Sequence, residues 1–220
     1  MDSGHSDAPR RRRAAAPDSA VFAPQKLLVA GGFAVGKTTM VAAISEVRPL
    51  LTEERLTTAS VGHDDLRGVP GKTTTTVALD YGRLTLTPQL VLYLFGVPGQ
   101  ERFWFMWDEL AYGALGAVVL ADVQRLDDCF PSVNYFEKRG LPFIVALNCF
   151  DGAPRYDPDE VREALDLDSP VPVVLCDARE LASVKQVLIT LVEHVAASRA
   201  RTAELAASSA PAATGATSGR

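Results

Sequence analysis

Short apolar runs alternate with helical patterns of polar and apolar positions through the middle of this chain. The runs typical of strands cover residues 26–32, 76–88, 90–96, 115–122, 143–148 and 171–177. Helical spacing of apolar residues marks Thr38–Val47, Glu101–Tyr112, Asp127–Lys138, Pro158–Leu165 and Leu181–Ala197. Because continuous apolar strands separated by helices are typical of buried parallel sheets, the pattern predicts an α/β fold. We expect a six-stranded, mostly parallel sheet with helices on both faces.

The second and third strand patterns and the two ends of the chain refine this prediction. Residues 76–88 and 90–96 are expected to pair antiparallel, joined near Thr87 and Pro88. Residues 1–23 are rich in Ala, Pro, Asp and Arg, and residues 199–220 in Ala, Ser, Thr and Gly. Neither segment can bury enough apolar surface to offset the entropy of ordering, so we expect two disordered tails around one domain, residues 24–198.

Composition narrows the class of protein. The chain has 220 residues and a net charge of -5, which argues against a general nucleic-acid binder. Its three cysteines form no CxxC pair, which suits a reducing cytoplasm. No apolar run approaches the roughly 20 residues that cross a bilayer. The run Arg10–Arg13 has two interpretations, a solvated charge block or peripheral attachment to the acidic inner face of a membrane.

The stretch GGFAVGKT matches the phosphate-binding pattern G-x-x-x-x-G-K-[ST]. A strand pattern precedes it and a helical pattern follows, so the backbone amides and the helix N-terminus can surround phosphate oxygens. Lys37 is expected to reach the β- and γ-phosphates, and the Thr38 hydroxyl to ligate Mg²⁺. The sequence therefore predicts a P-loop NTPase. Its expected phosphate-binding residues are Gly31, Gly32, Phe33, Ala34, Val35, Gly36, Lys37, Thr38 and Thr39.

Four further segments occur in the order found in Ras-like small GTPases. Gly99-Gln100-Glu101-Arg102-Phe103 resembles the family's GQERF, and TVALDY, from Thr76 through Asp80 to Tyr81, is similar to TIGVDF of the first switch. Asn148-Cys149-Phe150-Asp151 resembles the guanine-reading N-K-x-D, and Cys176-Asp177-Ala178-Arg179 resembles the S-A-K loop. The resemblance covers about Lys26 to Ser198. GGFAVGKTT, KTTTTVALDYGRL, FGVPGQERFWFMW and NCFD together look like the conservon-type GTPases of bacteria.

This resemblance implies a function and a set of partners. It implies a GTP/GDP molecular switch with Mg²⁺, slow GTP hydrolysis and stimulation by a partner. Conservon-type GTPases are encoded beside a sensor-kinase-like membrane protein and a roadblock-fold protein, and the gliding-motility GTPases are more distant relatives. By the same resemblance Gln100, Lys37 and Thr76 are catalytic, and Thr38 and Thr76 meet the metal. Nucleotide contacts beyond the P-loop fall to Gly99, Asn148, Cys149, Asp151, Cys176, Asp177 and Ala178.

Two departures from the family pattern keep other interpretations open. Gly96 stands where many Ras-like proteins have Asp, and Cys149 replaces the Lys of N-K-x-D. Pro98 also restricts the backbone just before Gln100. We therefore expect slow turnover and weaker binding, and a degenerate, non-hydrolysing GTP-binding module remains an alternative. A P-loop ATPase or nucleotide kinase is another, because apolar strand patterns end in Asp122 and Asp177 as a Walker-B strand would. The plainer interpretation of Asp122 is a loop residue or helix cap.

The aromatic run FWFMW, residues 103–107, cannot be buried on one helix face. We expect part of it to pack in the core and the remainder to form a partner-docking surface on the second switch. Arg83 and Arg102 are candidates for an arginine finger by sequence proximity, but a solvent-facing charge is the preferred interpretation of each. The long polar segment between Val47 and Thr76 fits a mobile first switch with an insertion.

Overall fold

The computed structural model describes residues 24–48, 54–55, 74–75, 79–87, 90–149, 155–167 and 170–208. The strands are β1 (Gln25–Gly31), β2 (Glu54–Arg55), β3 (Thr74–Thr75), β4 (Asp80–Thr87), β5 (Leu90–Gly96), β6 (Ala114–Ala121), β7 (Phe143–Asn148) and β8 (Val173–Cys176). The helices are α1 (Lys37–Ile44), α2 (Trp107–Ala111), α3 (Phe130–Arg139), α4 (Pro158–Ala164) and α5 (Leu181–Ser208), with 3₁₀ helices η1 (Glu101–Met106) and η2 (Leu126–Cys129).

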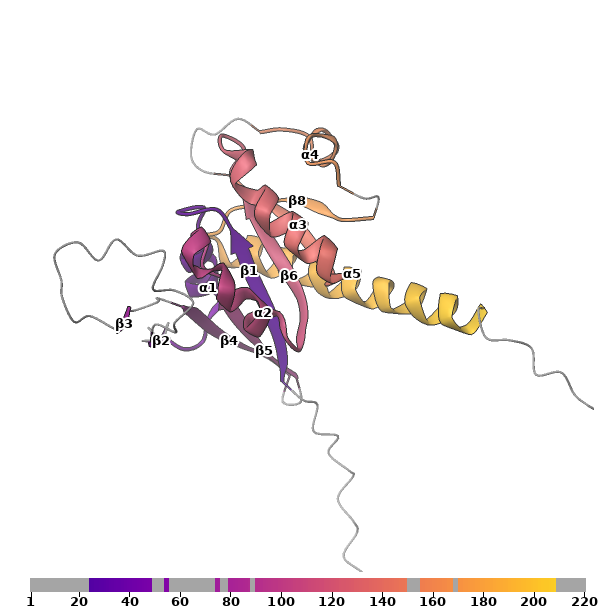
Figure 1. The fold of residues 1–220 in the computed structure, drawn as a ribbon, viewed down its shortest axis with the longest axis horizontal. Coiled ribbons are helices and arrows are strands. Elements are labelled where there is room, and N and C mark those ends of the chain that lie inside the picture. The colour runs from indigo at the N-terminus through magenta and orange to yellow at the C-terminus, as the bar shows by residue number, and fades with distance from the viewer. Residues whose placement is uncertain are drawn as a thin grey trace, which may run out of the picture.

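The main sheet has six strands in the order β4-β5-β1-β6-β7-β8 (Figure 1). All neighbouring strands run parallel except β4 and β5, which form the antiparallel hairpin predicted around Thr87 and Pro88. The predicted six-stranded, mostly parallel α/β sheet is therefore confirmed. A separate two-stranded ribbon pairs β2 with β3, inside the segment expected to be a long loop.

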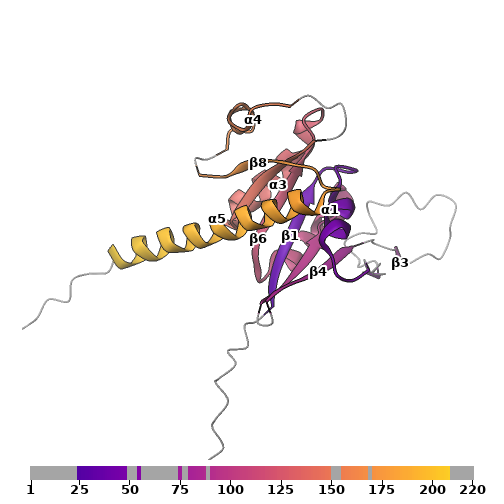
Figure 2. The same ribbon diagram turned by 180° about the vertical axis from the view of Figure 1, so that it is seen from behind.

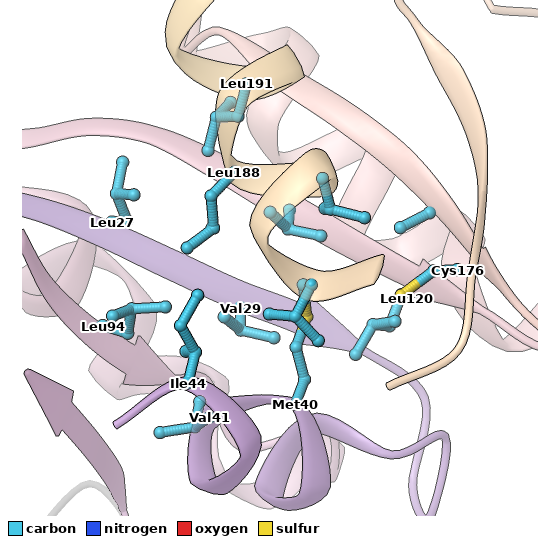
Figure 3. Close-up of a cluster of buried hydrophobic side chains, with 14 of the residues drawn as sticks. Leu27, Val29, Met40, Val41, Ile44, Leu94, Leu120, Cys176, Leu188 and Leu191 are labelled. Carbon is cyan, nitrogen blue, oxygen red and sulfur yellow. The ribbon is translucent and has the colours of Figure 1, made fainter. Parts of the chain in front are cut away.

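Helices cover both faces of the sheet, α1 and α5 on one and α2, α3 and α4 on the other (Figures 1 and 2). Alternation along β1 explains the two layers, because successive side chains point to opposite faces. Leu27 and Val29 pack with α1 and α5, whereas Leu28 packs with α3. Figure 3 shows the first of these layers, to which α1 contributes Met40 and Ile44 and α5 contributes Leu188. Fully burying each such side chain contributes about 1.5–3 kcal/mol.

Two predicted helices begin as 3₁₀ helices. The pattern expected as one helix over Glu101–Tyr112 is divided into η1 and the short α2, and Asp127–Lys138 begins in η2. Trp107, at the junction of η1 and α2, is buried and stacks on Phe136 of α3. The buried Trp107 explains why the segment begins as a 3₁₀ helix and not as an α-helix. In the tighter 3₁₀ turn, residues three apart, such as 104 and 107, lie on the same side of the helix. The rings of Trp104 and Trp107 are 5.8 Å apart.

Helix α5 is longer than predicted. It continues through Ser208, so residues 199–208, expected to belong to a disordered tail, are instead helical, with every side chain exposed. Adding Ala, Arg and Glu residues to an existing helix requires no new nucleation, which explains the extension. By length and composition alone α5 is the one described helix that could cross a membrane. Its buried residues Val184, Leu188 and Leu191 make it a core helix of this domain.

Candidate functional site

The loop between β1 and α1 forms the centre of the site. Gly31 and Gly36 have φ of 132° and 110°, values that L side chains rarely adopt. A Cβ atom at Gly36 would lie 2.6 Å from the Nδ2 atom of Asn148, so the position also lacks space for a side chain. Gly36 caps α1, whose first backbone N–H groups have no partner within the helix. Bent backbone and helix N-terminus together provide the amides of an anion site.

Lys37 lies inside the curve of this loop. Its Nζ atom donates to the carbonyl oxygens of Gly31 at 3.0 Å and Gly32 at 2.6 Å. Burial lowers the pKa of Lys37 to about 8, and the negative charge of Asp80 partly opposes that shift. The ammonium group is partly buried and is held by neutral carbonyl oxygens. Charged phosphate oxygens would stabilise it more strongly, so Lys37 is well placed to bind an anion.

Gly99 brings the second predicted segment against the same loop. A Cβ atom at Gly99 would lie 2.6 Å from the Gly31 carbonyl oxygen and 3.0 Å from Lys37 Nζ. Trp107 fixes the turn before it, since its indole Nε1 donates to the Pro98 carbonyl oxygen at 3.0 Å. Gln100 follows at the start of η1 and is half-buried. Gly99 therefore borders the phosphate loop, with Gln100 next to it in the chain.

Asn148 connects three loops of the site. Its Nδ2 donates to the Val35 carbonyl oxygen at 2.8 Å, and its Oδ1 accepts from the Ala178 amide at 3.0 Å. The side chain is 3% exposed, so both hydrogen bonds are shielded from water. The Cys149 amide also donates to the Cys176 carbonyl oxygen at 2.7 Å. Asn148, Cys149 and the C-D-A-R loop are thereby held beside the phosphate loop.

The C-D-A-R loop is stabilised from within. The Arg179 guanidinium pairs with the Asp177 carboxylate, and this contact lowers the pKa of Asp177 to about 2. The Asp177 amide donates to the Ser183 Oγ atom at 2.9 Å. Sequence reasoning missed Ser183, although a serine early in the following helix is an ordinary acceptor for a loop amide.

Asp80 is the other residue that sequence reasoning did not place in the site. The Thr38 hydroxyl donates to its Oδ2 atom at 2.7 Å, which joins the end of the sheet to the start of α1. Thr38 and Thr39 are exposed beside it, and Phe33 is 66% exposed at the loop tip. A hydroxyl and a carboxylate next to a phosphate loop are the oxygen donors that Mg²⁺ accepts, so the residues present fit the predicted metal.

Some predicted residues lie elsewhere or outside the described residues. Thr76 and Asp151 fall outside them, so their assignments remain predictions. Arg83 is exposed on β4, in keeping with its interpretation as a solvent-facing charge. Asp122 accepts from the Gln124 amide at 2.9 Å and from Arg125 Nε at 3.3 Å, which is the expected loop-capping role.

The aromatic run divides as expected between core and surface. Met106 and Trp107 are buried, whereas Trp104 and Phe105 are 38% and 44% exposed. Trp104 and Trp107 line a groove of about 500 Å³ together with Phe130 and Tyr135. The predicted docking role of the exposed side chains stays a prediction.

Comparisons with known proteins agree with this fold. A family model described as conserved hypothetical ATP binding protein matches residues 29–198. An uncharacterized protein of Methanocaldococcus jannaschii is 27% identical over 128 residues, 57% of this chain and 70% of its own length. The G domain of the T. maritima FeoB iron transporter superposes with a TM-score of 0.55 at 20% identity, covering 78% of this chain and 99% of that domain.

The cytosolic domain of the same transporter, in its GMPPNP form, gives a TM-score of 0.56 at 19% identity. That comparison covers 78% of this chain and 64% of the transporter domain. Identities this low show the fold alone. Fold, phosphate loop and family together make this chain a nucleotide-binding P-loop protein with the architecture of a G domain.

Proposed function

The chain belongs to the family described as conserved hypothetical ATP binding protein, and from that premise we propose that it is a small GTPase. It binds GTP with Mg²⁺, hydrolyses it slowly to GDP and signals through partner proteins as a molecular switch. The family description names ATP, whereas the residues that follow β7 favour guanine. The choice of base is therefore the point that decides the function.

The observation that supports guanine is the position of Asn148. Its two buried hydrogen bonds hold the start of the N-C-F-D segment against the phosphate loop, so a nucleotide on that loop would have its base near this segment. Asp151 follows three residues later in the sequence. A carboxylate there accepts hydrogen bonds from the N1 and exocyclic N2 groups of guanine, and adenine offers no such pair of donors. Two such bonds to a charged group are worth about 3–6 kcal/mol.

Hydrolysis and switching depend on Gly99 and Gln100. Gly99 lies so close to the phosphate loop that it has no space for a side chain. Gain or loss of a γ-phosphate would therefore change the position of the backbone at the start of η1. Gln100 would orient the attacking water, with Lys37 on the phosphates and Thr76 completing the metal site. Loss of the γ-phosphate would then release both switch segments.

Partners and location belong to the same proposal. The exposed Trp104 and Phe105 support a docking surface beside the second switch, where a roadblock-fold protein or a sensor-kinase-like membrane protein would bind. We place the protein in the cytoplasm, with Arg10–Arg13 as the segment that would reach the inner face of the membrane. These four arginines lie outside the described residues.

Competition binding tests the choice of base. Purified protein is loaded with fluorescent GDP in magnesium buffer and challenged with unlabelled GTP, GDP or ATP. Guanine nucleotides should displace the probe at concentrations roughly 10²- to 10⁴-fold lower than the concentration of ATP that is needed. Asp151→Asn should remove most of that difference while leaving the phosphate loop intact. Displacement by ATP and GTP at equal concentrations would contradict the GTPase proposal.

The family description keeps an ATPase as the second candidate, because it names ATP as the bound nucleotide. The same titration decides between the two. Multiple-turnover phosphate release, with Gln100→Leu as the control, then separates a GTPase from a binding module that signals by occupancy alone. Release that is absent from the wild type, even with a partner present, would favour the module.

A further inference from the structure

A glycine at the end of β5 faces a carboxylate on the neighbouring strand. Asp80 and Gly96 are paired directly across the antiparallel ladder of β4 and β5, and side chains of such a pair project on the same side. A Cβ atom at residue 96 would lie 2.7 Å from the Asp80 Cβ atom and 2.8 Å from its Oδ2 atom. Asp80 therefore occupies the space that a side chain at residue 96 would need.

The Asp80 carboxylate also faces the phosphate loop. Its Oδ2 atom accepts from the Thr38 hydroxyl at 2.7 Å, and its charge acts on the ammonium group of Lys37. Asp80 is half-buried while Thr38 is exposed, so the carboxylate is partly shielded but open toward the site.

We propose that Asp80 is the carboxylate that organises the Mg²⁺ site, in place of the acidic residue that many Ras-like proteins carry at the position of Gly96. The inference rests on the proposed function and names one more residue of the same site. A threonine hydroxyl can direct its lone pair to a metal while its proton is held by a carboxylate. The second carboxylate oxygen of Asp80 can accept from water on the metal, because Mg²⁺ keeps several waters when it binds nucleotides.

This assignment changes the meaning of Gly96. In the sequence it marks a lost carboxylate and suggests weak metal binding. In the structure the negative charge is retained and comes from β4 instead of β5. Residue 96 must then be small, because two carboxylates in direct contact would repel one another as well as clash.

The Mg²⁺ dependence of nucleotide retention tests the proposal without relying on hydrolysis. Release of fluorescent GDP is measured while Mg²⁺ is titrated, for the wild type, Asp80→Asn and Glu46→Gln. Asn can still accept from the Thr38 hydroxyl, so Asp80→Asn removes the charge and keeps the shape. Glu46 is a matched control because its carboxylate bonds Thr85, on the same strand. Thermal melting shows that each variant is folded.

Asp80→Asn should raise the Mg²⁺ concentration for half-maximal retention about 10- to 100-fold, the usual effect of losing a carboxylate that supports metal ligands. Retention in EDTA should match the wild type, and Glu46→Gln should leave the titration unchanged. A folded Asp80→Asn protein with the wild-type Mg²⁺ dependence would overturn the assignment of Asp80 while leaving the proposed function intact. A wild type that retains no guanine nucleotide at any Mg²⁺ concentration would overturn both.

A transplanted carboxylate provides an independent test. Asp80→Gly alone should raise the Mg²⁺ concentration for half-maximal retention, as Asp80→Asn does. The double variant Asp80→Gly with Gly96→Asp has space for the new side chain and returns a carboxylate to the site from β5. It should recover most of the lost Mg²⁺ affinity, whereas a purely structural role for Asp80 predicts no recovery. A folded double variant that stays as weak as Asp80→Gly would refute the transfer between strands.

Discussion

Removing the side chain of Asn148 should damage stability and nucleotide binding together. Asn148→Ala deletes two buried hydrogen bonds and leaves the Val35 carbonyl and the Ala178 amide without their partner. Each buried group left unsatisfied costs about 1–3 kcal/mol. The total of about 2–6 kcal/mol is a large part of the roughly 5–15 kcal/mol that stabilises a typical domain.

The expected loss can be read from melting and from binding. For a domain of this size about 1 kcal/mol lowers the melting temperature by about 2–4 °C, so Asn148→Ala should melt about 4–24 °C below the wild type. Part of this free energy stabilises the loop conformation that binds nucleotide. For every 1.4 kcal/mol by which that conformation is destabilised, the affinity for fluorescent GDP should fall about tenfold. Both are measured on the same preparation, by thermal melting without nucleotide and by fluorescence titration.

Two variants make this test specific. Asn134→Ala removes the same side chain from an exposed position of α3 and should change neither quantity. Asn148→Asp keeps an acceptor for the Ala178 amide but turns a carboxylate oxygen toward the Val35 carbonyl, so it should be at least as damaging as alanine. If Asn148→Ala melts with the wild type and binds as tightly, the two bonds do not hold the site together.

Three further outcomes follow from the described geometry. Gly36→Ala should abolish nucleotide binding at micromolar concentrations, because the position has a positive φ and no space for a Cβ atom; wild-type affinity would contradict this. A thiol reagent at neutral pH should modify Cys149 first, since burial raises the pKa of Cys129 to about 12 and of Cys176 to about 11. Mass spectrometry of tryptic peptides identifies the modified thiol. Bound GDP should protect Cys149 from the reagent. Deleting residues 199–220 should shift the melting temperature by no more than about 2 °C, because the side chains of residues 199–208 are all exposed to solvent; a larger drop in a calorimetric scan would show that this segment stabilises the domain.

The sequence alone determined the features that depend on local chemistry. The phosphate loop is one, because its conformation follows from glycines at fixed positions between a strand and a helix. The six strands are another, because continuous apolar runs predict buried strands wherever they occur. The C-terminal helix was predicted to begin at Leu181, and the structure starts it there. Its end was predicted wrongly, because solvent-exposed Ala-rich residues carry no periodic pattern by which an extended helix differs from a disordered tail.

Only the tertiary structure decided which residues from distant parts of the chain meet at the site. Asn148 bridges the phosphate loop and the Ala178 loop because β1, β6 and β7 are neighbours, an order that no local pattern contains. Asp80 faces Gly96 because the ladder of β4 and β5 has one particular register, and a shift by a single residue would turn its side chain to the other face. Long-range pairing sets such contacts, and the free energy that selects it is spread over the whole core.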